Sequence, residues 1–378
     1  MNNDFNCNFR VKILHVSESF GWSGGAAQAL ALAAGLKENG HDSAVACPEG
    51  GDLWKKAGAA GLKLCRFKPR RDYDLPCAIR LAELVTRRKP DILHAHHPKA
   101  HAMCLMAKAL SGYKPVLVVT RRVSHPLIKT VFAGLKYKSP LIDGYIAVAG
   151  AVRRMLVDYG LPPRKVRTIY SGVDLARFKP GPPSERILKE LALPQGAPVI
   201  GLIGNFSRDK GQHIFVEAAA RLREKGLDFT LIFAGRETDS AAMKELLAAH
   251  NAPPEKVRLL GLRHDVPELL SVMTLSVNAA VKGEALSGSI RESMAAGVPV
   301  IASDISGNGE IVIAGKTGLL FPPGDVETLY GRLKYALSDP VTVRAMARRG
   351  LEFVRGNFTV EAMVKKTLLY YSALLLKK

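Results

Sequence analysis

The chain has 378 residues, of which 47% are hydrophobic and 23% charged, and its formal net charge is +20. This length suggests about two domains, and the composition is typical of a globular protein. No apolar run approaches the roughly 20 residues that a membrane-spanning helix needs, and we expect no signal peptide. The five cysteines have neither metal-site spacing nor the pattern of a disulfide framework, so we expect a cytoplasmic protein.

The positive charge is concentrated in the first half. Residues 1–178 contain 28 Lys and Arg against 13 Asp and Glu, whereas the remainder contains 26 against 21. This asymmetry favours a surface that faces something anionic, such as a membrane leaflet or an acidic acceptor, although a generally basic protein is the alternative. A nucleic-acid partner is not expected, because no recognition motif is found and aromatic residues make up only 7%.

The first half alternates short apolar runs with helix-like stretches. The apolar runs predict strands at residues 11–16, 43–46, 62–67, 91–95, 116–120, 145–148 and 166–170. Helix-like spacing between them is found at residues 26–38, 78–88, 100–110 and 151–159. Near-continuous apolar strands that alternate with helices indicate a parallel sheet buried on both faces, so we expect a doubly wound domain.

Two turns of this half contain candidate binding residues. Gly24 and Gly25 follow the first predicted strand, where they would let a ligand approach the backbone; a plain tight turn is the alternative. Histidines cluster after the fourth strand, but the spacing of metal hydrolases is absent, so we expect no metal. We expect His96 to lie near an acceptor hydroxyl, with a purely structural histidine as the alternative.

Residues 127–138 are a candidate membrane contact. Their apolar residues at 127, 128, 131, 132 and 135 fit one helical face, and Lys129, Lys136 and Lys138 are available for lipid phosphates. A helix packed on its own sheet is the alternative interpretation.

The second half repeats the alternating pattern, with strands predicted at residues 199–204, 229–234, 257–260, 275–279, 298–303 and 318–321. The proline-rich stretch 178–184 can continue neither a helix nor a central strand, so it predicts the boundary. We therefore expect domains at 1–178 and 179–358. The last helix has no strand after it, and we expect residues 359–378 to pack back on the first domain.

Two turns of the second half suggest a ligand with both phosphates and hydroxyls. Arg208 and Lys210 follow a predicted strand, where they would neutralise a diphosphate, although two solvated surface charges are the alternative. Glu284 and Glu292 flank a Gly/Ser-rich turn before a helix, whose free N–H groups attract phosphate. Carboxylates accept hydrogen bonds from hydroxyls, so the pair suggests a sugar nucleotide. The alternative for Glu292 is a capping box that begins at Ser289.

The order of these motifs resembles that of family 4 of the retaining glycosyltransferases (GT4). The similar segments are residues 146–156 and 169–180, the turn 204–211, the loop 260–270, and the two glutamates with the Ala-Gly-Val-Pro-Val-Ile-Ala-Ser-Asp segment that ends at 304. The resemblance covers nearly the whole chain. It implies the GT-B fold, an α/β architecture in which two Rossmann-like doubly wound domains face each other across a cleft.

The resemblance also implies roles for particular residues. Glu292 would hold the ribose of a nucleotide-diphosphate sugar, Glu284 the transferred sugar, and Lys210 the diphosphate, which Gly25 would approach from the first domain. Donor binding is expected to involve Gly24, Gly25, Asn205, Arg208, Lys210, Ala285, Leu286, Ser287, Gly288, Ser289 and Glu292, and the base loop Leu262, Arg263 and Val266.

The chain departs from the family pattern at three places. Ala285-Leu286-Ser287 replaces a Gly-Phe-Gly sequence, and Asn205 replaces an arginine, for which Arg208 is a candidate substitute. Arg122 stands where the family often has a catalytic histidine. Arg122 is therefore expected to bind an anionic group on donor or acceptor. Glu284, Lys210, Arg122 and His96 are the predicted catalytic set.

The expected activity is transfer of a sugar, with retention, from a UDP or GDP sugar to a glycan, glycolipid or other anionic acceptor. No cofactor or metal is expected, and the family's habits suggest synthesis of an envelope glycan such as lipopolysaccharide core. Peripheral contact with an anionic inner leaflet is expected. A sugar-nucleotide 2-epimerase and a non-catalytic sugar-nucleotide-binding protein remain alternatives.

Overall fold

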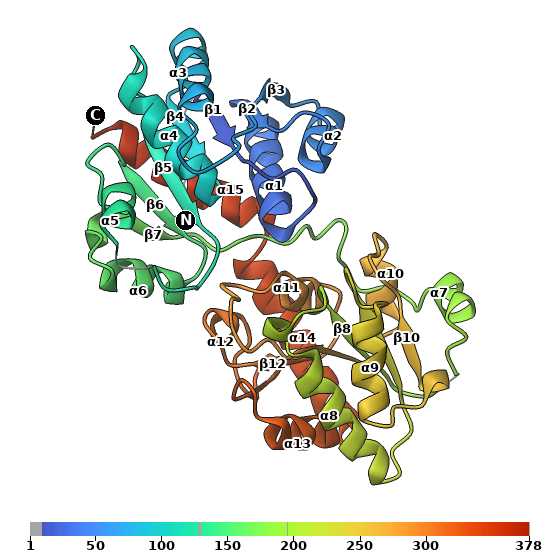
Figure 1. The fold of residues 1–378 in the computed structure, drawn as a ribbon. Coiled ribbons are helices and arrows are strands. Elements are labelled where there is room, and N and C mark those ends of the chain that lie inside the picture. The colour runs from blue at the N-terminus through green and yellow to red at the C-terminus, as the bar shows by residue number, and fades with distance from the viewer. Residues whose placement is uncertain (1–9, 128–129, 195, 378) are drawn as a thin grey trace, which may run out of the picture. The chain divides into compact units, whose positions relative to one another are not determined.

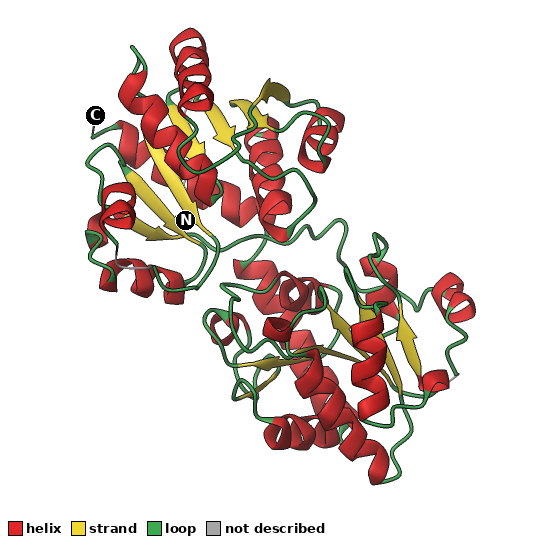
Figure 2. Cartoon of the chain, in the orientation of Figure 1, coloured by secondary structure: helices red, strands yellow, loops and turns green. Residues whose placement is uncertain are grey.

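The computed structural model describes residues 10–127, 130–194 and 196–377. The chain divides into two compact units. The first comprises residues 1–122, 126–172 and 360–378, and the second comprises residues 123–125 and 173–359. Each unit is a parallel sheet with helices on its two faces (Figures 1 and 2).

The described residues of the first unit form a sheet of seven strands in the order β3-β2-β1-β4-β5-β6-β7. The strands are β1 Lys12–Val16, β2 Asp42–Cys47, β3 Lys63–Arg66, β4 Ile92–Ala95, β5 Val116–Arg121, β6 Gly144–Ala147 and β7 Val166–Thr168. The helices are α1 Gly24–Glu38, α2 Asp52–Ala59, α3 Leu75–Arg88, α4 Pro98–Leu110, α5 Val131–Tyr137, α6 Gly150–Asp158 and α15 Val360–Leu375, with the short turn η1 Pro163–Lys165 before β7.

The described residues of the second unit form a sheet of six strands in the order β10-β9-β8-β11-β12-β13. The strands are β8 Val199–Ile203, β9 Thr230–Ala234, β10 Val257–Leu259, β11 Leu275–Asn278, β12 Val300–Ser303 and β13 Leu319–Phe321. The helical elements are α7 Glu185–Glu190, η2 Arg208–Lys210, α8 Gln212–Glu224, α9 Ala241–Ala249, η3 Pro254–Lys256, α10 Val266–Ser271, α11 Gly288–Ala295, α12 Asn308–Ile311, α13 Val326–Ser338 and α14 Pro340–Asn357.

In both sheets the order in which strands are added reverses once, at the same place in the sequence of strands. In each unit the chain lays down its first three strands toward one edge and then returns to add the fourth strand on the other side of the first. The resulting switch points lie between β1 and β4 and between β8 and β11. In open α/β sheets, ligands bind outside the carboxyl ends of the strands at such a point, so we expect binding residues in the loops after these four strands.

Helix α15 is built into the first unit, and Figure 1 shows it in red among the blue and green elements. Its side chains Met363, Val364 and Tyr371 belong to the core that contains β1, β4 and β5. Close packing depends on Gly35 of α1, where an added Cβ would lie 2.6 Å from a methyl group of Val364. The last helix therefore completes a core whose other members come from the first half of the sequence.

The units divide between Gly172 and Val173, a few residues before the proline-rich stretch that sequence suggested as the boundary. The reason is local pairing. The Val173 N–H donates to the carbonyl of Phe358 at 2.7 Å, and Val173 also forms a bridge with Thr359. Residues 173–178 therefore belong to the second unit. The assignment of residues 123–125 to that unit was not expected from sequence.

Candidate functional site

In the second unit, the turn after β8 holds Lys210 in a fixed position. Gly211 ends this turn in the left-handed region (φ 69°), and an added Cβ there would overlap the carbonyl oxygen of Ala279. The N–H of Val281 also donates to the carbonyl of Asp209 at 2.8 Å. The turn after β8 is thus packed directly against the turn after β11, across the switch point of the sheet.

This packing brings Lys210 and Glu284 together. The Lys210 ammonium forms an ion pair with the Glu284 carboxylate, although the two residues are 74 positions apart in the sequence. The Glu284 side chain is largely buried, at 12% exposure, whereas that of Lys210 is 36% exposed. The predicted sugar-binding carboxylate therefore neutralises the predicted diphosphate-binding cation in this structure.

The other predicted residues of the turn after β8 have different surroundings. The Asn205 side chain accepts a hydrogen bond from the Arg236 N–H at 3.0 Å, so it fixes the neighbouring loop. The buried Gln212 amide donates to the Asn205 carbonyl at 3.0 Å. Arg208 is exposed, and its charge lowers the pKa of His213, together with the larger effect of burial. Arg208 therefore remains accessible, whereas Asn205 has a structural partner.

Helix α11 begins beside this pair. Its N-cap is Ser287, and no side chain caps its first N–H groups in the described structure. The first N–H groups of a helix have no acceptor within the helix, so those of Gly288 and Ser289 are available to an anion. The capping box proposed as an alternative for Glu292 does not form, because the helix begins before Ser289.

Glu292 lies in the second turn of α11, beside the N-terminus of the helix. A Cβ added to Gly288 would be 3.9 Å from a carboxylate oxygen of Glu292. Burial raises the pKa of Glu292 to about 7, and the charges of Arg291 and Arg177 oppose this effect. Arg291 is itself buried, which lowers its pKa to about 10, and it donates to the Leu286 carbonyl at 2.9 Å. The carboxylate of Glu292 is thus poorly solvated and ready to accept hydrogen bonds.

A buried amide network supports the Gly/Ser-rich turn and was not anticipated from sequence. The amide nitrogen of Asn278 donates to the Ser287 hydroxyl at 3.0 Å, and Ser287 and Ser289 share a hydrogen bond of 3.1 Å. The Asn308 amide donates in turn to the Asn278 side chain at 3.3 Å. Asn278 ends β11, so a polar residue at the end of an apolar strand was the available signal. The flanking Ala285 and Leu286 are buried.

Residues 123–125 form a second support that sequence reasoning missed. The Ser124 hydroxyl donates to the backbone carbonyl of Glu284 at 2.6 Å. The ring of His125 lies against Gly283, where an added Cβ would be 3.2 Å from two ring atoms. Gly283 has φ 83°, a conformation that favours glycine. The turn that carries Glu284 is therefore held by a segment 160 residues earlier in the chain.

The predicted base loop is fixed by ion pairs. Arg263 pairs with Glu190 at 2.5 Å and with Asp265 at 2.7 Å. The hydrogen bonds that Asp265 accepts, first from Arg263 and then from Arg186, hold its pKa well below the usual range. Leu262 is half exposed, and Val266 begins α10. Arg177 donates to the carbonyl of His264 at 3.0 Å. The guanidinium of Arg263 is thus committed to carboxylates, whereas Leu262 remains available to a planar base.

In the first unit, Gly24 and Gly25 begin α1 directly after β1. An added Cβ on Gly25 would lie only 2.7 Å from a ring nitrogen of His97, so a larger residue at this position would displace that ring. His97 follows β4, and its other ring nitrogen shares a hydrogen bond of 2.9 Å with Ser17. The loops after β1 and β4 therefore meet at the switch point, as the corresponding loops do in the second unit.

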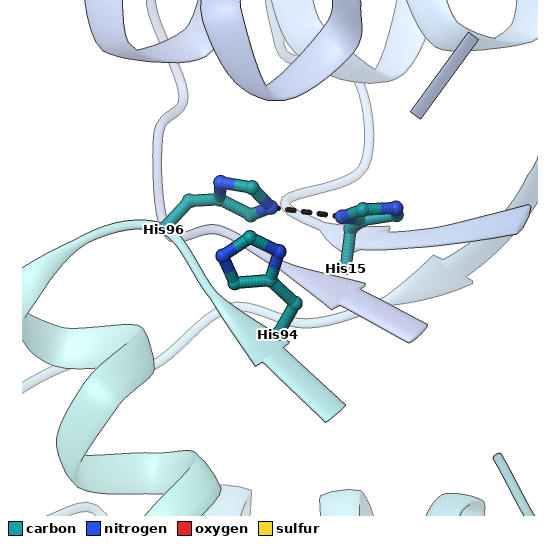
Figure 3. Close-up of side chains that lie close together, drawn as sticks. All are labelled: His15, His94 and His96. Carbon is teal, nitrogen blue, oxygen red and sulfur yellow. Dashed lines mark hydrogen bonds between the residues drawn. The ribbon is translucent and has the colours of Figure 1, made fainter. Parts of the chain in front are cut away.

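Three buried histidines lie beneath this junction (Figure 3). His15 and His96 share a hydrogen bond of 2.9 Å, and the rings of His94 and His96 lie 4.1 Å apart between centroids. Burial lowers the pKa of all three far below the ordinary value, so they are neutral at pH 7. His94 is held from both sides, by Thr120 at 2.6 Å and by Tyr371 at 2.5 Å.

The three ligand nitrogens lie within 4.8 Å of one another, as a metal site would require. Two observations favour a hydrogen-bonded network instead. Both ring nitrogens of His94 already have partners, and the Arg122 guanidinium lies 3.4 Å from His96 and would repel a cation. The neutral ring of His96 therefore presents an acceptor to Arg122, which also donates to Ser171 at 3.3 Å.

The predicted residues thus gather in two groups, one in each unit. Lys210, Glu284 and Glu292 surround the start of α11 in the second unit. Gly25 and Arg122 lie with the histidines in the first unit, where His96 is only 1% exposed and contacts Arg122. A covered His96 is placed to orient Arg122.

Two family matches cover most of the chain. Residues 22–177 match "Glycosyltransferase Family 4", and residues 183–353 match "Glycosyl transferases group 1". The 2-deoxystreptamine glucosyltransferase of Streptomyces kanamyceticus is 30% identical over 272 residues, which cover 71% of this chain and 69% of that protein. The chain belongs to glycosyltransferase family 4. This GT4 protein is accordingly a glycosyltransferase, which the motif order of its sequence had indicated.

Further comparisons agree with the assignment. The lipopolysaccharide core biosynthesis glycosyltransferase LpsE of Rhizobium meliloti (strain 1021) is 26% identical to the GT4 protein, over 93% of this chain and 96% of that one. The crystal structure of Anabaena Alr3699/HepE in complex with UDP-glucose has a TM-score of 0.83 at 20% identity, and the match covers 96% of this chain and 100% of that one. The GT4 protein therefore has the GT-B fold. Within its described residues, no helix has the length and apolar character to cross a bilayer.

Proposed function

We propose that the second unit binds a nucleotide-diphosphate sugar at the start of α11, and that the enzyme transfers its sugar to an acceptor hydroxyl with retention. The observation that carries the proposal is the contact between Lys210 and Glu284 beside uncapped helix N–H groups. A cation and helix N–H groups complement a diphosphate, and two nearby carboxylates complement sugar hydroxyls. The UDP-glucose of the similar Anabaena structure favours UDP over GDP as the nucleotide.

The proposed roles follow from the surroundings of each side chain. Glu292 accepts hydrogen bonds from the ribose hydroxyls, because its carboxylate is poorly hydrated beside the helix start. Lys210 moves from Glu284 to the diphosphate when the donor binds, which frees Glu284 to accept from the sugar hydroxyls. Ser124 keeps the Glu284 turn in place during this exchange. The exposed Leu262 contacts the base.

The proposed reaction breaks the bond between the anomeric carbon and the diphosphate oxygen, and it forms a bond from the acceptor oxygen on the same face. The acceptor proton passes to an oxygen of the leaving diphosphate, so no separate base is needed. Lys210 and the N–H groups of α11 stabilise the charge that develops on the diphosphate, and orientation supplies the remainder of the rate enhancement. We propose that this charge stabilisation requires no metal or other cofactor.

We propose further that the acceptor carries an anionic group and belongs to an envelope glycan such as lipopolysaccharide core. The printed name of the LpsE relative supports this class, and so does the excess of cations in the first half of the sequence. In the first unit, Arg122 is oriented by the neutral His96 and by Ser171. A guanidinium held in this way is suited to a carboxylate or phosphate.

A thermal-shift panel of UDP, GDP and ADP sugars tests the donor proposal. One nucleotide class should raise the Tm, and Glu292→Ala should abolish the shift.

Lys210→Ala should lower kcat/KM by roughly 100-fold or more, because a group that meets the developing charge is lost. Lys225→Ala at the end of α8 is a matched control. Indifference to every donor would contradict the proposal, and conversion of the sugar nucleotide alone would favour a 2-epimerase.

We also propose peripheral contact with an anionic membrane through α5. Its residues Val131, Phe132 and Leu135 are 77%, 70% and 66% exposed, and the Phe132 ring lies 6.5 Å from that of Tyr73, which is also exposed. Exposed apolar side chains of this size favour insertion at a bilayer surface.

The cations near α5 differ from the sequence expectation. Lys129 and the apolar residue 128 lie outside the described residues. Lys136 is buried and donates to the carbonyl of Pro98 at 2.8 Å, so it is not available to lipids, whereas Lys138 is exposed. Phe132→Ser should reduce sedimentation with phosphatidylglycerol vesicles, with Val341→Ser on α14 as the exposed apolar control. Equal sedimentation of both variants and the parent would exclude this surface.

A further inference from the structure

A hollow of about 560 Å³ lies in the first unit at the edge strand β7. Its walls come from α6, from η1 and β7, and from the end of α15. The described sheet places β7 three strands away from β4, so the hollow is separate from the switch point between β1 and β4. Neither the donor residues of the second unit nor Arg122 and the histidines line it.

Four of the residues that line the hollow are cations: Arg153, Arg164, Arg167 and Lys377. The lining contains no Asp or Glu, and among the described residues none of these four side chains forms an ion pair with a carboxylate. Arg164, Arg167 and Lys377 are exposed at the rim. Like charges that converge without a counter-charge repel one another, so the hollow is electrostatically suited to an anion.

The hollow is also shaped by fixed hydrogen bonds. The Arg153 guanidinium donates to the carbonyl of Val166 at 3.3 Å, and the Tyr370 hydroxyl donates to the carbonyl of Lys165 at 2.7 Å. These bonds tie α6 and α15 to the β7 segment. The nearby acidic residue Asp143 pairs with Lys108 at 2.5 Å, so its charge is already compensated.

The donor groups around the hollow match a phosphate. Guanidinium groups bind phosphate oxygens through paired N–H donors, and Thr168, whose hydroxyl is able to donate, is also among the lining residues. A carboxylate offers two oxygens in one plane, whereas a phosphate or diphosphate offers several in different directions. Cations that approach from α6, η1, β7 and the residues after α15 therefore fit the second shape better.

We propose that this hollow, which we call the β7 anion site, binds phosphate groups separately from the donor site. The ligand class is a phosphate ester or diphosphate, carried either by a soluble or acceptor molecule or by a phospholipid headgroup. The competing explanation is that the cations only keep the exposed edge of β7 from pairing with another strand. This explanation predicts no affinity beyond that of any two surface cations.

Calorimetric titration with pyrophosphate at physiological salt tests the proposal. The titration uses the full chain carrying Lys210→Ala and Arg208→Ala, which remove both cations that we place at the donor site. Adding Arg164→Ala and Arg167→Ala should weaken pyrophosphate binding roughly tenfold. The matched control adds Arg344→Ala and Arg348→Ala, which remove two exposed cations from α14. This control should change the affinity less than twofold. Circular dichroism checks that each variant is folded.

The β7 anion site would be overturned if both added pairs of substitutions weakened pyrophosphate binding equally, or if neither pair weakened it. Sedimentation with phosphatidylglycerol vesicles then distinguishes the sources of phosphate. Loss of vesicle binding only in the Arg164 and Arg167 variant, together with weaker pyrophosphate binding, identifies a lipid headgroup. Unchanged vesicle binding with weaker pyrophosphate binding identifies a soluble or acceptor phosphate. Loss of vesicle binding with unchanged pyrophosphate affinity would also count against the site.

Discussion

The carboxyl group of Glu292 is ionisable, but burial leaves it with little water to stabilise the charged form. Burial raises its pKa to about 7, and the neighbouring cations Arg291 and Arg177 only partly offset this effect. A carboxylate in this state gains more from an incoming hydroxyl donor than a solvated one would, because water already satisfies the solvated group. Poor hydration therefore prepares Glu292 for a ligand.

Glu292→Gln should change the pH dependence of stability. The folded pKa is raised above the ordinary value of 4.5, so ionisation of Glu292 destabilises the fold increasingly as pH rises from about 4.5 to about 7. The amide has no such charge. The Tm of Glu292→Gln relative to the parent should therefore rise between pH 5 and pH 8, as measured by scanning calorimetry in buffers of equal ionic strength.

The matched control for this measurement is Glu245→Gln at an exposed position of α9. It introduces the same amide substitution away from the site. A Tm difference between Glu292→Gln and the parent that stays constant across this pH range would show that burial does not penalise the charge. The donor-binding role of Glu292 would then need another physical basis.

At the scale of single elements, the turn after β8 depends on one glycine. Gly211→Ala would place a methyl group onto the Ala279 carbonyl in addition to straining the left-handed backbone. It should cost about 3 kcal/mol or more of unfolding free energy. Gly226→Ala, at φ 79° with no neighbour within 4 Å of the new methyl group, should cost only about 1 kcal/mol.

Urea unfolding of both glycine variants separates the two effects. The difference between them reports the close approach of the turns after β8 and β11, because the backbone strain is common to both. Gly211→Ala should also lose donor binding, since Lys210 precedes this position. Equal losses of unfolding free energy in the two variants would mean that the turn after β11 moves aside for the new methyl group at no measurable free-energy cost.

The strands and their order along the chain could be predicted from the sequence, because short runs of branched apolar residues flanked by turns seldom form anything other than strands. Every strand expected from sequence is present within a few residues of its predicted position. The alternation with helices also identified parallel sheets, since such strands must be buried on both faces. These features depend on local pattern and are therefore recoverable from one sequence.

Contacts between distant residues were not readable in the same way. The bond from Ser124 to the Glu284 carbonyl joins positions 160 apart, and the pair of Arg263 and Glu190 joins positions 73 apart. Nothing in the local pattern of either segment specifies its partner. The start of α11 shows the same limit. The Asn278 amide donates to the hydroxyl of Ser287, the residue before the first residue of α11. The local sequence around Ser287 does not reveal this partner.

At the scale of the whole molecule, the two units have separate cores. The core of the second unit contains Phe215 and Phe233 with their centroids 5.6 Å apart. The first unit instead depends on α15, whose Tyr371 hydroxyl supplies the second partner of the buried His94. Units with independent cores can unfold in separate transitions, and a perturbation confined to one unit should then shift one transition only.

Scanning calorimetry should therefore resolve two unfolding transitions that respond to different perturbations. Tyr371→Phe leaves one nitrogen of buried His94 without its hydroxyl partner, at a cost of about 1–3 kcal/mol. It should lower the transition of the first unit by about 2–8 °C. Saturating UDP, which we propose binds the second unit, should raise only the transition of that unit. If both perturbations moved one common transition, the two cores would unfold as a single cooperative body, and donor binding would then stabilise the residues around Arg122 as well.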